Sequence, residues 1–302
     1  MVRLVSEVVA IFGPTGVGKT AVAVELADLL RARGEDPVAI SADALQVYRG
    51  LETLTGVASA AERERLEHRL VSFVDVADTF SAGEFMPLAH AEIDSALATG
   101  RRPIVLGGTG LYLRAALTEL SLAPQPPPEL RERLQREIEV RGPAALHAEL
   151  SRRAPQAAAT IEPSDRTRIV RSLELIEMGA EPPRTEGSEL WTAETRRPTR
   201  LFGLVRDRDD LYARIDARVD AMAAAGAAEE VRRADAAGAS HTARKALGFE
   251  ELLTGDLEEM KRRTRNYAKR QLTWMRKLPD VTVIDLTGRD APAAAAEIAS
   301  AL

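Results

Sequence analysis

Cysteine is missing altogether from this 302-residue sequence, and there are only four histidines. Without thiols the chain can form no disulfide, no thiolate metal site and no cysteine nucleophile. His68, His90, His147 and His241 show no metal-ligand spacing, so we interpret them as structural or surface groups.

Long hydrophobic runs are lacking as well. No apolar stretch approaches the roughly 18 residues needed to span a bilayer, so we expect no membrane association. Residues 1–6 run directly into the first apolar segment, and we therefore expect no signal peptide and a cytoplasmic location. With 45% hydrophobic and 29% charged residues, the chain can form one large domain with an insertion, or two domains.

The net charge of −5 does not by itself indicate a polyanionic partner. The segment from Met260 to Lys277 differs, because it holds eight lysines and arginines and no acidic residue, interleaved with Tyr267 and Trp274. Such a segment can be a solvated helix face or a nucleic-acid contact, and its charge alone leaves both open.

One segment fits the phosphate-loop pattern G-x-x-x-x-G-K-[ST] at every fixed position. An apolar run at 7–12 precedes it as a predicted strand, and residues 21–33 follow with helical spacing. The pattern is typical of nucleotide-binding proteins, including those that bind ATP. Its N–H groups face an anion, Lys19 adds positive charge, and the Thr20 hydroxyl can ligate Mg²⁺, the predicted cofactor. The predicted diphosphate-binding residues are Gly13, Pro14, Thr15, Gly16, Val17, Gly18, Lys19 and Thr20.

The first hundred residues alternate predicted strands and helices, which favours an α/β fold with a parallel, P-loop NTPase-like sheet flanked by helices. In such a sheet the ligand lies at the carboxyl ends of the strands. Three segments should therefore meet there: the phosphate loop, Asp43, and Gly107-Gly108-Thr109-Gly110. The strands are predicted at 7–12, 37–41 and 103–106, and the helices at 19–33 and 82–99.

Consecutive prolines at 124–128 mark a change of composition. Helical spacing follows, and a strand pattern returns at 199–205. We predict a helical insertion domain over 120–198, within a core of 1–119 and 199–302. Helices are predicted at 129–141, 144–153 and 165–178 in the insertion, and at 208–224, 227–237, 249–253 and 256–277 in the core.

The strand at 103–106 lacks the terminal aspartate that a nucleotide hydrolase with this loop normally uses for magnesium. Asp43 ends the neighbouring strand instead, where its carboxylate could take a proton from a nucleophile facing a bound diphosphate. The residues alone leave open a turn or helix-cap role for Asp43, and a plain strand-to-helix turn for 107–110.

Seven segments, in order, resemble the signature motifs of the tRNA dimethylallyltransferase family, and the resemblance covers nearly the whole chain. Two departures concern the loop at 51–70: residues 51–58 lack the lysine usual in the family, and a pair of histidines is reduced to His68. The matching segments are 13–20, 41–50, 107–112, 165–174, 211–219, 246–251 and 264–274.

This resemblance implies transfer of a dimethylallyl group from dimethylallyl diphosphate to N6 of the adenosine at position 37, 3′ of the anticodon, in tRNAs reading codons that begin with U. It implies Asp43 as the general base, Thr109 as the residue that orients the amine, and Arg214 in a diphosphate clamp. Without the resemblance, an exposed Arg214 paired with Asp210 would be the preferred interpretation. The expected partners are dimethylallyl diphosphate and a tRNA anticodon stem-loop, and we expect a monomer.

The resemblance also implies that the adenosine is flipped out and received by Asp43, Ala44, Leu45 and Gln46, with the Gln46 amide reading an adenine edge. Each basic residue carried over as a tRNA contact could also be a solvated one. Together they would make binding salt-dependent. The remaining predicted tRNA contacts are Thr109, Arg131, Thr167, Arg168, Ile169, Val170, Arg171, Arg244, Lys245, Gly248 and Arg265.

Three other functions fit part of the sequence. A prenyltransferase for free adenine nucleotides would share the loop and the base, but the insertion and the basic 260–277 segment argue against it. Gly107-Gly108 disfavours a small-molecule kinase or NTPase. An intact Lys19 and Thr20 together with Asp43 disfavours an RNA-binding module with a vestigial loop.

Overall fold

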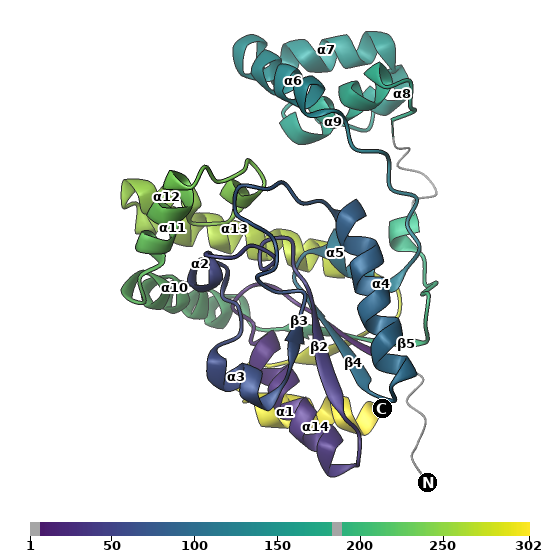
Figure 1. Cartoon of the computed structure of the whole chain (residues 1–302), viewed down its shortest axis with the longest axis vertical. Helices are drawn as coiled ribbons and strands as arrows, with labels where there is room; N and C mark the ends of the chain where they lie inside the picture. The colour runs from purple at the N-terminus through teal and green to yellow at the C-terminus, as the bar shows by residue number, and fades with distance from the viewer. Residues whose placement is uncertain (1–6, 183–188) are drawn as a thin grey trace. The chain divides into compact units, whose positions relative to one another are not determined.

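The computed structural model describes residues 7–182 and 189–302, so residues 1–6 and part of the irregular stretch 179–198 lie outside it. The chain forms two compact units, one of Met1–Glu119 with Trp191–Leu302 and one of Leu120–Leu190. Figure 1 shows the helices and strands of each unit.

The first unit is built on a six-stranded sheet in the order β3-β2-β4-β1-β5-β6, and every strand pair in it is parallel. β1, β2 and β4 are buried along their whole length, which explains their continuous apolar sequences. The predicted α/β class with a parallel sheet flanked by helices is confirmed. The strands are β1 (Val8–Phe12), β2 (Pro37–Ala42), β3 (His68–Arg69), β4 (Arg102–Gly107), β5 (Thr199–Val205) and β6 (Val281–Asp285).

Helices cover both faces of this sheet. Val9 and Ile11 of β1 belong to the core cluster that also contains α1 (Lys19–Ala32) and α14 (Ala291–Ala301). Because side chains alternate along a strand, Val8, Ala10 and Phe12 face the opposite side, where α4 (Ala82–Ala98) and α5 (Gly110–Leu117) contact β4.

A second apolar cluster of this unit lies beside the carboxyl ends of the strands and is mainly helical. It packs Leu54, Phe249 and Met260 together, with Tyr48 from the loop after β2. Its helices are α2 (Glu52–Thr55), α10 (Arg208–Ala224), α11 (Ala227–Ala236), α12 (Phe249–Thr254) and α13 (Leu257–Met275), and a short α3 (Ala60–Arg65) lies near α1.

The sequence patterns did not reveal β6 and α14. β6 is an edge strand in which only Ile284 is buried, so it lacks an apolar run. α14 begins with Asp290 as its cap and Pro292 in its first turn, but its many alanines give a weak pattern. The short α2, α3, α5 and β3 were also missed.

The second unit consists of α6 (Pro128–Arg141), α7 (Pro143–Arg153), α8 (Pro155–Ala158) and α9 (Arg166–Glu177) around their own core of Leu134, Leu146 and Leu173. It ends at Leu190 rather than at 198. The next residues belong to the first unit, because Trp191 stacks on Trp274 with ring centroids 4.6 Å apart and the Arg196 N–H donates to the Leu117 carbonyl at 2.7 Å.

None of the helices in 7–182 and 189–302 has both the length and the apolar character that crossing a bilayer requires.

Candidate functional site

A cavity of about 740 Å³ opens at the carboxyl ends of β1, β2 and β4. Residues of the phosphate loop, Asp43 and Gly107-Gly108 line it, together with side chains from α2, α10 and α13. The sheet register explains this meeting, since Phe12 and Ala42 both pair with Gly107. The three predicted loops therefore meet, as a parallel sheet requires.

The phosphate loop is held by its glycines. Gly16 and Gly18 have φ of 80° and 108°, in the region that favours glycine, and a Cβ on Gly13 would lie 2.9 Å from the Leu204 carbonyl oxygen. Two of the predicted anion-binding N–H groups are already donated within the protein: that of Val17 to the Pro14 carbonyl and that of Thr15 to Gln271.

The Lys19 side chain is half-buried against this loop, and its ammonium group donates to the carbonyls of Gly13 and Pro14 at 2.9 and 3.0 Å. Burial lowers the pKa of Lys19 from its ordinary 10.5 to about 8, the Asp43 carboxylate opposes this shift, and Arg218 adds to it. A bound anion would restore the charge of the ammonium group.

This shift predicts proton uptake when inorganic pyrophosphate binds. Above pH 8 most of the free protein has a neutral Lys19, and the anion raises its pKa again, so each binding event takes up a proton there. Below about pH 7 Lys19 is already charged and the uptake disappears. Calorimetric titrations in buffers of different ionisation enthalpy measure the uptake.

Lys19→Arg is the control for this measurement, because its guanidinium stays charged throughout. Protonation of pyrophosphate itself contributes equally in both proteins. Equal proton uptake by the two proteins at pH 8.5 would contradict the prediction.

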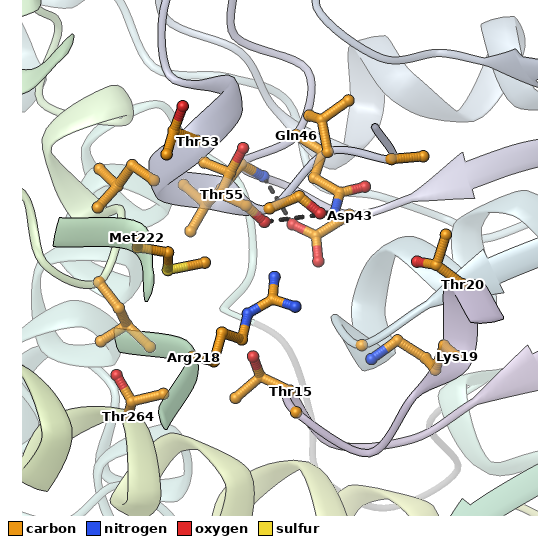
Figure 2. A pocket seen from close by; sticks show the side chains of 18 of the residues that line it. Thr15, Lys19, Thr20, Asp43, Gln46, Thr53, Thr55, Arg218, Met222 and Thr264 are labelled. Carbon is orange, nitrogen blue, oxygen red and sulfur yellow. Dashed lines mark hydrogen bonds between the residues drawn. The ribbon is translucent and has the colours of Figure 1, made fainter. Parts of the chain in front are cut away.

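Asp43 projects into the cavity from the end of β2 and faces the same space as Lys19 and Arg218 (Figure 2). One carboxylate oxygen, Oδ1, accepts the Leu45 N–H at 3.0 Å, which is the turn role that the sequence left open. The two interpretations are compatible, since one oxygen holds the turn while the other can accept a proton.

Arg218 is the functional side chain that sequence reasoning missed. It lies on α10 one turn after Arg214, lines the cavity, and packs against the face of Gly56, where a Cβ would overlap its guanidinium. Burial lowers the pKa of Arg218, and the carboxylates of Asp43 and Glu62 oppose the shift. Among the described residues it has no hydrogen-bond or ion-pair partner, so this cation is available to a ligand. Its spacing of four from Arg214 could have revealed it.

Arg214 lies at the edge of the same site. Its Nε donates to the Gly16 carbonyl at 3.1 Å, and the side chain is exposed. The pairing with Asp210 that sequence alone preferred is wrong, because Asp210 instead accepts from Arg206 at 2.8 Å. Both arginines line the cavity, but Arg214 is exposed and contacts the phosphate loop, whereas Arg218 is half-buried and faces Asp43 and Lys19.

Thr109 begins α5 and lies 3.4 Å from the hydroxyl of Tyr267. Burial raises the pKa of Tyr267 to about 12, with a further contribution from the Asp43 carboxylate, so Tyr267 stays protonated. The turn at 107–110 is tightly packed: a Cβ on Gly110 would meet the Trp274 ring, and one on Gly107 would lie 2.9 Å from the Ala42 carbonyl oxygen.

The Gln46 side chain forms hydrogen bonds within the protein. Its Oε1 accepts from the Ser41 hydroxyl at 2.9 Å, and its Nε2 donates to the carbonyls of Thr55 and Gly56 at 3.3 and 3.1 Å (Figure 2). The amide nitrogen of Gln46 thus helps to hold the loop after β2 against the residues at the end of α2.

The divergent 51–70 loop forms a wall of the cavity. Glu230 of α11 accepts the N–H groups of Thr53 and Leu54 at 2.9 and 3.0 Å, which anchors the start of α2. His68 donates from Nδ1 to the Leu66 carbonyl at 2.7 Å, and burial lowers its pKa.

The metal prediction has partial chemical support. The Thr20 hydroxyl and the Asp43 carboxylate line the same cavity, which suits an ion that prefers a few oxygen ligands plus phosphate and water. No group of three or more histidine, cysteine or carboxylate side chains placed to hold a metal occurs within 7–182 and 189–302. A magnesium ion at Thr20 would therefore need a diphosphate to supply other ligands.

Two of the arginines predicted to bind tRNA in the second unit pair with one carboxylate. Arg131 and Arg171 each contact Glu174 at 3.0 Å, and Glu174 is itself buried. Arg168 is the most available, with 71% of its side chain exposed. Ile169 and Val170 are buried in the core of this unit, which leaves their side chains almost no surface for tRNA.

The basic α13 is less positive than its sequence indicated. Carboxylates from other segments pair with it: Asp220 with Lys261, Glu251 with Arg263, and Asp216 with Arg265 at 2.6 Å. Arg262 pairs with Glu259 of the same helix, while Lys269 and Arg270 lie over the rings of Tyr212 and Tyr267.

The other predicted contacts of this unit lie beside α12. Arg244 pairs with Asp235 and Glu250, next to Lys245 in the same short turn. Gly248 has a φ of 98° and packs on Met260 and Leu54, so its role in the structure is close packing.

Comparisons with known proteins agree with this geometry. A family profile described as IPP transferase matches residues 46–278. The chain is 42% identical over 294 residues to a tRNA dimethylallyltransferase of Symbiobacterium thermophilum, covering 94% of this chain and 90% of that protein. It is 44% identical over 283 residues to one from Anaeromyxobacter dehalogenans, covering 89% and 91%.

Solved structures are similar as well. The crystal structure of the tRNA isopentenylpyrophosphate transferase from Bacillus halodurans matches with a TM-score of 0.68 and 34% identity, covering 98% of this chain and 95% of that one. A eukaryotic dimethylallyltransferase acting on tRNA matches with a TM-score of 0.71 and 25% identity, covering 93% and 74%.

Proposed function

This chain belongs to the IPP transferase family and is a prenyltransferase that modifies tRNA, and we propose that dimethylallyl diphosphate is its donor and N6 of the adenosine at position 37 its acceptor. We propose tRNAs reading codons that begin with U as substrates, and a cytoplasmic monomer as the working form. One observation carries the chemistry: a phosphate loop, two half-buried cations and one carboxylate face a single cavity.

The leaving group determines what the cations do. As the bond between the allylic carbon and the diphosphate oxygen breaks, negative charge accumulates on the diphosphate. Lys19 and Arg218 lie inside the cavity, where low polarity strengthens their attraction for that charge, and Arg214 adds a contact at the loop. Magnesium held by Thr20 would contribute further positive charge.

The acceptor needs a base, because the exocyclic amine of adenine is conjugated with the ring and is a weak nucleophile. As N6 bonds to the allylic carbon, its proton passes to the Asp43 oxygen that the turn leaves unused. We propose that the Thr109 hydroxyl, which lies beside the cavity-lining Tyr267, orients the base. The tail of the donor would occupy the apolar part of the cavity lined by Leu54, Met222 and Met260.

We propose that exposed basic side chains of both units contact the RNA. Arg168 is the exposed arginine among those predicted in the second unit. In the first unit, four basic side chains of the 260–277 segment have no described carboxylate partner: Lys269, Arg270, Arg276 and Lys277. Contacts of this type make affinity fall steeply with added salt.

A labelling experiment tests the function directly. The purified protein is mixed with labelled dimethylallyl diphosphate and with either an anticodon stem-loop or free AMP. We expect label on the stem-loop alone, at the adenosine next to the anticodon. Label on AMP alone would favour the free-nucleotide prenyltransferase instead.

A further inference from the structure

One side of α13 faces the cavity. Thr264, Tyr267 and Gln271 all line it, and their spacing of three and four residues places them on the same side of the helix. Tyr267 contacts Thr109, while Gln271 is buried at 4% exposure between two loops.

Gln271 uses both ends of its amide on backbone groups. Oε1 accepts the Thr15 N–H of the phosphate loop at 2.9 Å, and Nε2 donates to the Gly108 carbonyl at 2.7 Å. The fit is close, since a Cβ on Gly108 would lie 2.5 Å from Nε2. Only a side chain that donates and accepts at this length makes both bonds.

We propose that Gln271 is a positioning residue that fixes the spacing between the phosphate loop and the loop carrying Thr109. This inference rests on the proposed function, in which the first loop holds the leaving group and the second orients the attacking amine. Gln271 also takes up the Thr15 N–H, so the anion is received by the remaining N–H groups of the loop. A misplacement of about 1 Å between reacting groups costs on the order of 100-fold in rate.

The test compares two neighbouring side chains of α13. Gln271→Leu removes both bonds at nearly constant volume, whereas Leu272→Ala removes apolar packing, breaks neither bond and changes a side chain that does not line the cavity. We expect kcat to fall about 10- to 100-fold in Gln271→Leu. The dissociation constant of inorganic pyrophosphate should rise about threefold or more in Gln271→Leu. Leu272→Ala should lower Tm at least as much, with kcat within about twofold of the unchanged protein.

Gln271→Glu separates the two bonds. Its carboxylate still accepts from Thr15 but has no proton for the Gly108 carbonyl, whereas the protonated form can make both bonds. Burial raises the pKa of such a carboxyl group. The kcat of Gln271→Glu, divided by that of the unchanged protein, should therefore rise as pH falls from 8 to 6.

Two results would overturn the inference: a kcat for Gln271→Leu no lower than that of Leu272→Ala, or a flat pH ratio for Gln271→Glu. If Gln271→Leu does not fold, the pH ratio alone decides. An unchanged protein that prenylates no RNA would contradict the proposed function, and the pyrophosphate affinities would still decide the role of Gln271.

Discussion

Asp43→Asn should lower kcat by about 10²- to 10⁴-fold, the usual range for loss of a general base. The amide keeps an oxygen for the Leu45 N–H, so the turn after β2 should persist and the free energy of unfolding should change little. Affinity for an anticodon stem-loop should stay nearly constant, because the change affects proton transfer. Single-turnover rates and filter binding measure the two quantities.

Asp75→Asn is a matched control for this variant, because Asp75 accepts the Ala77 N–H in a similar turn and does not line the cavity. It should retain full activity. Full activity of Asp43→Asn would remove Asp43 from the role of base. The loss of the carboxylate should also lower the pKa of Lys19 further, because Asp43 is the group that raises it.

Arg218→Gln should lower kcat/KM by about 10²- to 10³-fold, as expected when a donor aimed at developing charge is removed from a low-polarity site. Stability should not fall, because the described part of the chain gives this half-buried guanidinium no ion-pair or hydrogen-bond partner. Steady-state kinetics and thermal unfolding of the same preparation measure both effects.

Substitutions of two other arginines of α10 serve as controls for this prediction. Arg214→Gln changes an exposed side chain that contacts the phosphate loop and should cost about tenfold or less. Arg208→Gln, at the exposed start of α10, should cost nothing measurable. A larger loss for Arg214→Gln than for Arg218→Gln would make Arg214 the principal diphosphate cation.

The sequence predicted the parts of the site that depend on local pattern. The phosphate loop follows from fixed residue types, and its meeting with Asp43 and Thr109 follows from the parallel sheet, in which strand ends gather at one edge. Roles that depend on distant partners were out of reach. Gln271 joins Thr15 and Gly108 across most of the chain, and no periodicity reports such a bridge.

Misplaced expectations have the same physical origin. The Gln46 amide was predicted to hydrogen-bond an adenine edge because an amide can both donate and accept. In the structure its nitrogen donates to the nearby carbonyls of Thr55 and Gly56. The positive charge of α13 was counted along the sequence, whereas the neutralising Asp216, Asp220 and Glu251 belong to other helices. Edge strand β6 was missed because an edge has one partner and little burial.

The last residues of three neighbouring strands are in register, because Gly107 of β4 pairs with both Phe12 of β1 and Ala42 of β2. The positions of the three strand ends are therefore set by backbone hydrogen bonds, which every residue other than proline can make through both its N–H and its carbonyl. The separation of Asp43, the phosphate loop and the turn at 107–110 thus depends on the backbone of the sheet. The second unit is inserted between α5 and β5, and none of its residues takes part in the pairing of β1, β2 and β4. A change in the length of this insertion therefore leaves the register of these strands unaltered.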